Sequence, residues 1–418
     1  MITRFWQPTI RDPGWEGEGW PPALTRVGGV TSYAQALRLE GLGTTVFAEM
    51  SALALETGSI NLGQGFPDTD GPIEVADAAV AAIRAGVNQY SPGPGQPDLR
   101  LAIAAHQQRF YGLELDPATE VVVTTGATEA VAAALLGLVD PGDEVVALEP
   151  FYDSYAACIQ MAGGVRVPVT LRAPDFRLDL DRLRAAVTDR TRLILLNSPH
   201  NPTGKVLTEA ELTAVADLAV ERDLVVVTDE VYEHMTYDVA HRPLATLPGM
   251  RERTLTISSA GKTFSFTGWK VGWATGPADL VRAVLTAKQF LTFVSGAPFQ
   301  PAVAVGLRLS DAYFDQLRAT LRGKRDRLCA GLREVGFDVF VPQGTYFVTA
   351  DVRPLGWADG LEFCRELPRR AGVVAIPHQV FYDDVEAGRP LVRFAFCKRD
   401  EVLDEALDRL QVLRPQAG

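Results

Sequence analysis

The chain has 418 residues, of which 47% are hydrophobic and 22% charged, and its formal net charge is −12. This length suits a large domain plus a smaller one, and an acidic chain without a Lys/Arg-rich run is not expected to bind nucleic acid. Four cysteines without CxxC spacing and five histidines without a metal-binding spacing predict a cytoplasmic protein with no disulfide framework and no metal site.

The chain begins MITRFWQPTIRDPGWEGEGWPP, a stretch rich in Pro, Gly and Trp without periodicity. It lacks the basic-then-apolar pattern of a signal peptide, and we interpret 1–30 as a flexible N-terminal extension. An arm that packs on a partner subunit is the alternative. Residues 121–139 are the most apolar window, but Gly126 and Glu129 interrupt it. This window therefore predicts a strand, a turn and a helix rather than a membrane span, and no membrane partner is expected.

Between about 120 and 275, short apolar runs alternate with segments of helical spacing. The runs are rich in β-branched residues, as in strands buried on both faces. They lie at 121–123, 144–148, 192–196, 224–228, 254–257 and 271–274. Segments such as 128–139 and 208–222 predict helices, and Thr208 followed by Glu211 predicts a capping box. The predicted fold class is α/β, with a mostly parallel central sheet flanked by helices.

The pattern changes after about residue 310, where a long charged helix at 310–334 is followed by short strands and helices. We predict that 76–309 form the large domain. The segments 31–75 and 310–418 are expected to combine in a small α+β domain built from both chain ends.

The residues that follow each predicted strand are candidate site residues, because ligands of open α/β sheets bind beyond the carboxyl ends of the strands. One such stretch, SSAGKTFSFTGWKVGW, contains the Gly-Lys-Thr of a phosphate-binding P-loop. A P-loop needs a glycine five residues before Gly261, where this chain has Thr256. A Rossmann fingerprint fails too, because Asp98 stands where the third glycine after Gly93 and Gly95 belongs.

Lys262, at the end of a predicted strand, can instead form a Schiff base with an aldehyde cofactor. Pyridoxal phosphate would need a carboxylate on its ring nitrogen, donors to its phenolic oxygen and a helix N-terminus for its phosphate. Asp229 and Tyr232 follow the run at 224–228, and Asn201 lies in the turn NSPHNPTGK. Taken singly, these residues also fit a helix cap, a packed aromatic side chain and a structural turn.

The phosphate has candidate partners on two segments. Gly126, Ala127 and Thr128 open an Ala/Leu-rich helix, whose first N–H groups favour an anion. Ser259 and Lys270 flank Lys262, which leaves Lys270 free to serve as the phosphate cation. An ordinary helix start and a solvated lysine are the alternatives.

Six motifs, in this order along the chain, resemble those of the class I pyridoxal-phosphate aminotransferases of fold type I. They are INLGQGFPD, NQYSPGPG, NSPHNPTGKV, TDEVYEHM, SAGKTFSFTGWKVGW and LVRFAFCK. The resemblance runs from about 44 to 413 and is strongest to the kynurenine/glutamine/methionine aminotransferase group. Within that group, the chain is most similar to actinobacterial N-succinyldiaminopimelate aminotransferase-like proteins.

The resemblance implies pyridoxal 5'-phosphate as cofactor and assigns roles around its ring. Lys262 would be the Schiff-base lysine. Asp229 would contact the ring nitrogen. Tyr232 and Asn201 would contact the phenolic oxygen, and the ring of Tyr152 would lie against the cofactor.

The resemblance also implies a phosphate site made of Ala127, Thr128, Ser259 and Lys270. Tyr90 would reach the phosphate of the other subunit of a homodimer.

For the substrate, the resemblance implies that Arg393 binds the α-carboxylate as a bidentate pair, with Gly65 and Asn201 beside it. Phe47 and Phe293 would line the substrate side, Phe293 from across the dimer interface.

The implied activity is the transfer of an amino group between an L-amino acid and a 2-oxo acid by a ping-pong mechanism. N-succinyldiaminopimelate and 2-oxoglutarate, in lysine biosynthesis, are the candidate pair. The alternative is a kynurenine-, glutamine- or methionine-type enzyme with carbon–sulfur β-lyase activity on cysteine conjugates. Kynurenine-type members often carry Tyr, Trp and His where this chain has Thr128, Phe47 and Val294, which argues against kynurenine. A non-catalytic regulator is a third class, disfavoured because the motif set is complete and no basic patch is present.

Overall fold

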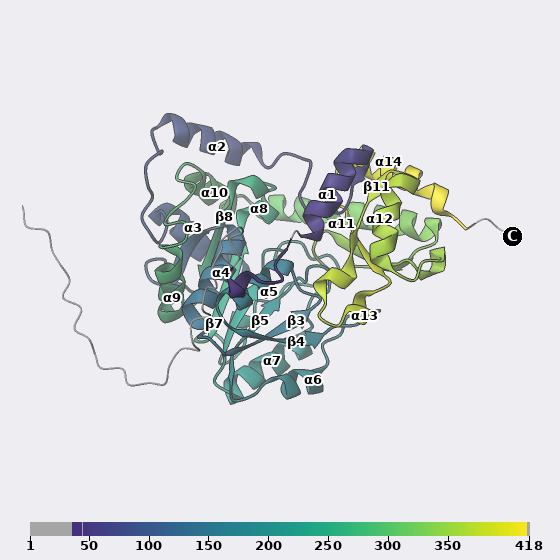
Figure 1. Cartoon of the computed structure of the whole chain (residues 1–418). Coiled ribbons are helices and arrows are strands. Elements are labelled where there is room, and N and C mark those ends of the chain that lie inside the picture. The colour runs from purple at the N-terminus through teal and green to yellow at the C-terminus, as the bar shows by residue number, and fades with distance from the viewer. Residues whose placement is uncertain (1–35, 44, 416–418) are drawn as a thin grey trace, which may run out of the picture. The chain divides into compact units, whose positions relative to one another are not determined.

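The computed structural model describes residues 36–43 and 45–415, and from Arg38 onward the chain forms one compact unit. Its course is drawn in Figure 1. The predicted extension at 1–30 lies outside the described residues. In the part of the chain that is described, the helices are too short or too polar to cross a bilayer.

The secondary-structure elements alternate along the chain. The strands are β1 (Ile60–Asn61), β2 (Val121–Thr125), β3 (Glu144–Glu149), β4 (Val165–Thr170), β5 (Thr191–Asn197), β6 (Val225–Asp229), β7 (Thr254–Ser259), β8 (Val271–Thr275), β9 (Asp338–Phe340), β10 (Phe347–Asp351), β11 (Val373–Val374), β12 (Ile376–Pro377) and β13 (Leu391–Ala395). The helices are α1 (Val46–Thr57), α2 (Ile73–Arg84), α3 (Pro97–Tyr111), α4 (Gly126–Leu138), α5 (Asp153–Met161), α6 (Leu180–Ala186), α7 (Glu209–Glu221), α8 (Ala260–Thr263), α9 (Ala278–Lys288), α10 (Phe299–Leu307), α11 (Asp311–Val335), α12 (Gly360–Ala371), α13 (Val385–Gly388) and α14 (Asp400–Leu410).

A seven-stranded sheet in the order β2-β8-β7-β6-β5-β3-β4 forms the centre of the first part of the fold. Its strands pair in parallel except around β8, which is antiparallel to both β2 and β7. All six strands expected from the apolar runs are present, and the mostly parallel α/β fold class is confirmed. The edge strand β4 was not predicted, because its sequence VRVPVT carries an arginine and a proline and only one of its residues is fully buried.

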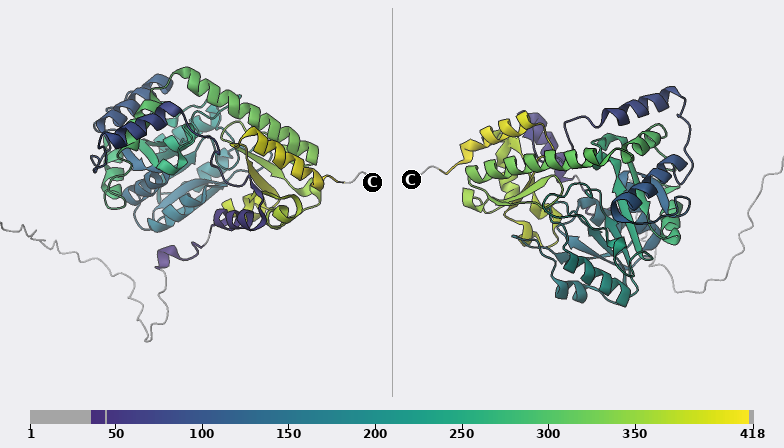
Figure 2. Two further views of the ribbon diagram at one scale, coloured as in Figure 1. Left: turned by 90° about the horizontal axis from the view of Figure 1, so that it is seen from above. Right: turned by 180° about the vertical axis from the view of Figure 1, so that it is seen from behind.

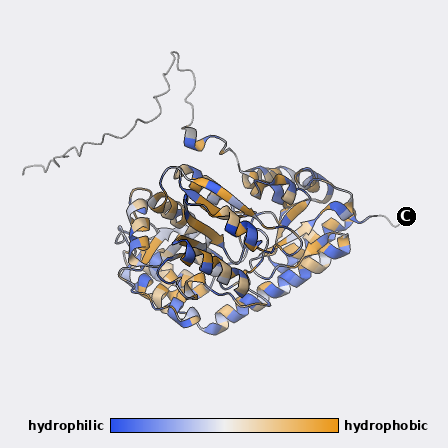
Figure 3. Cartoon of the chain, turned by 90° about the horizontal axis from the view of Figure 1, so that it is seen from below, coloured by the Kyte–Doolittle hydropathy of each residue, from blue (hydrophilic) through white to orange (hydrophobic). Residues whose placement is uncertain are grey.

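Helices cover both faces of this sheet, and alternate residues of the strands point to each face. Val145 and Leu193 pack against α4, α5 and α9, whereas their neighbours Val146 and Ile194 pack against α6 and α7. Near the β2 edge, α3 and α10 complete that second face. In Figure 3 the strands are mostly orange and the blue residues lie mainly on the outer helices. Burial on both faces explains why these strands read as continuous apolar runs.

A second, four-stranded sheet in the order β12-β13-β10-β9 lies in the C-terminal part of the chain. Strand β1 pairs in parallel with β11, and α1 packs against α12 and β11, so residues near 46–61 join the C-terminal core. The division into a large domain of 76–309 and a small domain of 31–75 and 310–418 nevertheless stays a prediction.

The 25-residue helix α11 connects the two cores. Phe314, in its first turn, packs near β2 and β8, whereas Leu328 and Leu332 pack in the core of the four-stranded sheet. Figure 2 shows this helix running alongside both parts of the fold.

Two local predictions have different outcomes. The capping box is confirmed: the Glu211 N–H donates to the Thr208 hydroxyl, and the Thr208 N–H donates to the Glu211 carboxylate. The prediction that Lys262 ends a strand is wrong, because β7 stops at Ser259 and Lys262 lies in the four-residue helix α8.

Candidate active site

A cavity of about 480 Å³ lies where the carboxyl ends of the parallel strands face β13 of the second sheet. Twelve of the predicted site residues line it: Phe47, Gly65, Ala127, Thr128, Tyr152, Asn201, Asp229, Tyr232, Ser259, Lys262, Lys270 and Arg393. The structure thus brings together residues that are up to 346 positions apart in the chain, from Phe47 to Arg393.

Lys262 presents its amine to this cavity between two aromatic rings. The Nζ atom lies 5.8 Å from the ring centroid of Tyr232 and 5.7 Å from that of Tyr346. Burial lowers the pKa of the Lys262 amine, and neighbouring Arg393 and Lys270 lower it further, whereas Asp229 opposes the shift. A lowered pKa increases the fraction of the neutral amine, which is the nucleophilic and basic form.

Asp229 closes β6 with a buried carboxylate held by two hydrogen bonds. The Tyr155 hydroxyl donates to Oδ2 at 2.6 Å, and the Val231 N–H donates to Oδ1 at 3.3 Å. Burial raises the pKa of the Asp229 carboxyl, and both hydrogen bonds and nearby Lys262 pull it back down. No helix directly follows Asp229 in the described chain, so the helix-cap alternative is wrong: the Oδ1 atom accepts a backbone N–H within the turn after β6.

Arg393, on β13, is 1% exposed and is held in a fixed pose. One terminal nitrogen donates to Asn201 Oδ1 at 2.8 Å and the other donates to the Gly63 carbonyl at 2.9 Å, while the Phe347 ring stacks 3.9 Å from the guanidinium carbon. The buried Nε has no hydrogen-bond partner, and burial lowers the pKa of Arg393 to about 10. A buried donor of this kind is suited to an anionic ligand.

The N-terminus of α4 forms a cradle of backbone N–H groups at the other end of the cavity. The helix has no side-chain cap, so its first N–H groups are free to bind an anion. Gly126 has a φ of 72°, and a Cβ atom there would lie 3.3 Å from Lys270 Nζ. The cationic amine therefore lies directly over the cradle.

The remaining two predicted residues, Tyr90 and Phe293, do not line the cavity. Their rings pack edge-to-face with centroids 5.4 Å apart, and Tyr90 is 83% exposed. Within one subunit, the structure brings them together but not to the other site residues.

The model of the family "Aminotransferase class I and II" matches residues 57–410, which is most of the chain.

The chain belongs to this aminotransferase family.

Relatives with assigned activities agree with this membership. The probable N-succinyldiaminopimelate aminotransferase of Mycobacterium tuberculosis is 58% identical over 90% of this chain and 98% of that protein. A solved structure of that organism's N-succinyldiaminopimelate aminotransferase superposes with a TM-score of 0.89 over 91% of this chain and 100% of that one. Methionine aminotransferase of Escherichia coli is 40% identical over 90% of this chain and 97% of that protein. Kynurenine–oxoglutarate transaminase of Dictyostelium discoideum is 39% identical, with 92% and 97% coverage.

The predicted aminotransferase activity and the predicted cofactor class are confirmed, since this family depends on pyridoxal phosphate. The residues present fit that cofactor. The aminotransferase has a buried carboxylate, a buried amine and an uncapped helix N-terminus with a cation above it, all around one cavity. The role of each residue stays a prediction and is developed below.

Strand β8 packs against the cradle of N–H groups at the start of α4, the predicted phosphate site, and Gly272 is the residue that allows this contact. A Cβ atom on Gly272 would lie 2.5 Å from the Gly126 carbonyl carbon and 2.7 Å from the Ala127 nitrogen. We expect Gly272→Ala to displace the cradle backbone and weaken cofactor binding by at least about tenfold, since backbone atoms cannot move aside cheaply. Fluorescence titration of the cofactor-free aminotransferase measures the loss.

The matched control is Gly268→Ala, in the same segment, where a Cβ atom would meet nothing within 4 Å. It should bind the cofactor like the wild type. Equal affinity of the two alanine variants would contradict the cradle assignment.

Tyr155 is a functional residue that the sequence interpretation missed. It lies on α5 and is fully buried against Asp229, 74 residues away in the chain. Tyr155→Phe removes the donor that favours the ionised carboxylate, so the pKa of Asp229 should rise further. In its predicted role at the ring nitrogen, Asp229 acts as the ionised carboxylate, so activity is expected to be lost as pH falls through its pKa. We therefore expect the acid limb of the kcat/KM profile to move to higher pH in the variant. An unchanged acid limb would show that the bond does not tune Asp229.

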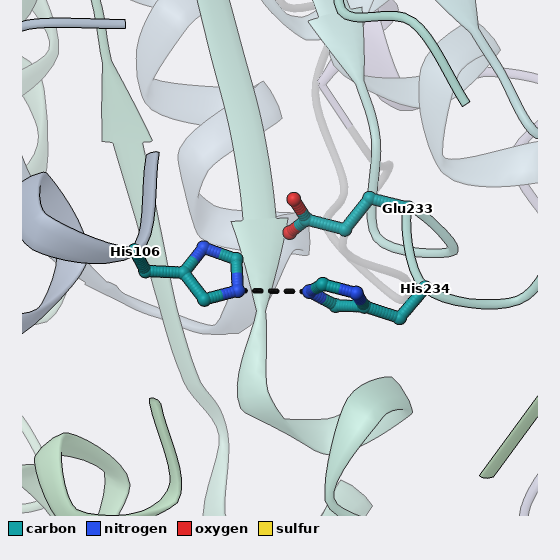
Figure 4. A group of neighbouring side chains, drawn as sticks. All are labelled: His106, Glu233 and His234. Carbon is teal, nitrogen blue, oxygen red and sulfur yellow. Dashed lines mark hydrogen bonds between the residues drawn. The ribbon is translucent and has the colours of Figure 1, made fainter. Parts of the chain in front are cut away.

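A second polar cluster is buried outside the cavity and consists of His106, Glu233 and His234 (Figure 4). The two Nε2 atoms lie 2.8 Å apart and share a hydrogen bond, and the Glu233 carboxylate accepts from the Ser258 hydroxyl at 2.6 Å. Two nitrogens bound to one zinc ion would be about 3.3 Å apart, given Zn–N bonds of ~2.0–2.1 Å. Burial lowers the pKa of His106 to about 3, so the pair is uncharged. The 2.8 Å separation therefore favours a direct hydrogen bond between the two uncharged rings over a shared zinc ion. In the same cluster, Glu233 holds Ser258, the residue before Ser259.

Proposed function

We propose that this aminotransferase transfers the amino group of N-succinyldiaminopimelate to 2-oxoglutarate. The observation that carries the proposal is the 58% identity to the Mycobacterium tuberculosis protein, against 39–40% to the kynurenine and methionine enzymes. Lysine and diaminopimelate biosynthesis is the corresponding pathway.

In the proposed mechanism, Arg393 binds the substrate α-carboxylate through its guanidinium, including the partner-free Nε. Asn201 keeps Arg393 in place, and its own N–H is held by Asn197 Oδ1 at 2.7 Å. The Asn197 amide in turn donates to the Asp229 carbonyl at 2.8 Å. A chain of hydrogen bonds therefore connects Arg393 to the main chain of Asp229, the residue proposed to contact the ring nitrogen.

Pyridoxal phosphate, when bound, supplies an electron sink for the pair of electrons left on the substrate Cα. Asp229 would keep its ring nitrogen protonated, with Tyr232 and Asn201 at the phenolic oxygen and Tyr152 against the ring. Ala127, Thr128, Ser259 and Lys270 would hold the phosphate. The Lys262 amine, whose pKa burial lowers, would take the proton from the substrate Cα as general base and deliver it to the cofactor carbon C4′ as general acid.

The distal part of the substrate would lie near side chains that carry no positive charge. Among the described residues that line the cavity, the basic side chains are Lys262, Lys270 and Arg393, and each already has a role. The polar side chains left at the cavity wall are Thr45, Gln64, Asp153, Ser154 and Thr267. The four neutral ones can bind the amide of an N-acylated side chain as well as a carboxylate, and Asp153 can accept from the amide N–H, which supports an N-succinyl substrate.

The alternative is a methionine- or kynurenine-type enzyme with β-lyase activity, and the aromatic part of the wall favours it. Phe47, Phe66 and Phe347 line the same cavity and would pack against an apolar side chain. The same site could also expel a β-leaving group from a cysteine conjugate.

A donor screen against 2-oxoglutarate separates these functions. Under the proposal, kcat/KM for N-succinyldiaminopimelate exceeds that for methionine, glutamine and kynurenine by at least about 100-fold, or about 2.7 kcal/mol. A higher kcat/KM for any of the other three would overturn the substrate assignment. Stoichiometric pyruvate and ammonia from a cysteine conjugate, without an oxo acid, would instead establish the lyase.

We further propose a homodimer in which Tyr90 and Phe293 of each subunit contribute to the partner's cavity. Their exposure supports the proposal: Tyr90 is 83% exposed and Phe293 is 49% exposed, and the two rings pack on each other at the surface. Sedimentation at decreasing concentration tests this state, and a fully active monomer would contradict it.

A cytoplasmic location is also proposed. The four cysteines are free and buried, as expected of a protein from a reducing compartment. Cell fractionation tests the location.

A further inference from the structure

Lys288 is a buried lysine outside the cavity, at the end of α9. It is 2% exposed, and its Nζ donates to the Phe293 carbonyl at 2.8 Å and to the Gly93 carbonyl at 3.2 Å. Burial lowers the pKa of the Lys288 amine, and nearby Glu129 opposes this shift. Burying a lysine amine costs free energy, so the two backbone carbonyls that accept from Lys288 indicate that this residue has a specific structural role.

The two carbonyls belong to two segments, 88–96 and 289–297, which we call the arm. Several contacts join these segments besides Lys288. The Gln96 side chain donates to the Ala297 carbonyl at 2.9 Å, and the Gln96 N–H donates to Gln300 Oε1 at 2.7 Å. Tyr90 packs on Phe293 at the surface of the arm. The arm therefore forms one structural unit, although nearly 200 residues separate its halves.

Phe293 is held in an unfavourable backbone conformation. Its φ of 64° lies in the left-handed region, which a bulky non-glycine residue adopts only when its surroundings enforce it. Lys288 contributes to that enforcement twice, because its Nζ binds the Phe293 carbonyl and its own carbonyl accepts from the Phe293 N–H at 3.2 Å.

The base of the arm is fixed to the phosphate cradle of its own subunit. The Thr292 hydroxyl is hydrogen-bonded to the Glu129 carboxylate and lies 3.0 Å from the Thr125 hydroxyl. Glu129 also accepts from the Thr125 N–H at 2.5 Å. The exposed aromatic side chains of the arm thus project from a rigid base.

We propose that Lys288 is a positioning residue that acts on the partner subunit: it fixes the pose in which Tyr90 and Phe293 enter the partner's cavity. This inference rests on the proposed dimer. It predicts that a defect at Lys288 appears in the active site of the other subunit, not in that of its own.

Lys288→Met keeps the apolar stem and removes both donors. In the cofactor-free protein, we expect the peptides covering 88–96 and 289–297 to exchange amide hydrogens faster together, at least about tenfold, because both lose the same donor. In the loaded enzyme, kcat/KM should fall about tenfold. Lys288→Gln can donate to these carbonyls through its amide, so its kcat/KM and exchange rates should lie between those of the wild type and the Met variant. It replaces the Met variant in these measurements if that variant does not fold. Faster exchange in one segment alone would contradict the shared role.

Mixed dimers provide the decisive test. Lys288→Met subunits are paired with Lys262→Ala subunits, and the heterodimer is isolated through two different affinity tags. In this heterodimer, only the cavity of the Lys288→Met subunit contains Lys262, and it receives the intact arm of the Lys262→Ala subunit. We expect about half the activity of the wild-type dimer, since one of two sites is restored. Activity at half the level of the Lys288→Met homodimer would show that Lys288 acts within its own subunit and would overturn the inference.

A parallel heterodimer of Tyr90→Phe with Lys262→Ala separates this inference from the proposed dimer. If it regains activity and the Lys288→Met pair does not, only the role of Lys288 is wrong. If neither pair regains activity, the shared cavity itself is contradicted, and the inference falls with it.

Discussion

Lys262→Ala is expected to lower kcat by at least about 10⁴-fold, the upper range for loss of a general acid–base group. The side chain lines a cavity, so its removal leaves space for solvent rather than a void in the core, and the fold should persist. The variant should also lose the visible absorbance of a cofactor bonded to the lysine. Stopped-flow turnover, absorbance spectra and circular dichroism measure the three outcomes.

Lys324→Ala is the matched control, since this lysine lies on α11, outside the cavity, and its Nζ donates to the Lys398 carbonyl. It should retain wild-type turnover and absorbance. Wild-type transamination by Lys262→Ala would remove Lys262 from the mechanism.

Arg393→Met is expected to lower kcat/KM about 10²- to 10³-fold, as when one partner of a buried charged pair is truncated. The loss should affect the amino donor and the oxo-acid acceptor alike, because both carry the α-carboxylate. Arg393→Lys should recover only part of the loss, since an ammonium cannot make a bidentate contact. Steady-state kinetics with each substrate varied in turn measure the effect.

Arg365→Met is the control for a lost guanidinium, since Arg365 is half exposed and pairs with Glu49 at 2.8 Å. It should change kcat/KM less than about twofold, as an exposed ion pair contributes little. A loss confined to one of the two substrates in Arg393→Met would contradict a shared carboxylate site.

The sequence predicted where the cavity would form, because the side chains that end parallel strands meet at one edge of a sheet. Asp229 is the last residue of β6 and Asn201 follows β5 closely, and these positions at strand ends made their placement predictable. Arg393 and Gly65 could be placed only by family resemblance, since they come from elements outside the parallel sheet.

Other features depend on contacts between distant residues and left no local signal. Tyr155 looks like an ordinary helix aromatic until its hydroxyl meets Asp229. The reversed direction of β8 follows from how the chain returns after Lys262, and the apolar run VGWAT is compatible with either direction. The role of Lys288 likewise depends on Gly93, 195 positions away.

In the proposed site, the two ends of an amino acid are bound from different sheets: the carboxylate by Arg393 on β13, and the amino group near Lys262 after β7. The spacing between these groups is therefore set by the packing of one sheet relative to the other, and α11 is the longest element common to both cores. All α-amino acids have the same separation between these two groups, so this tertiary distance selects α-amino acids as a class and not one side chain. Residues of α11 that touch no substrate can therefore change the rate of the reaction.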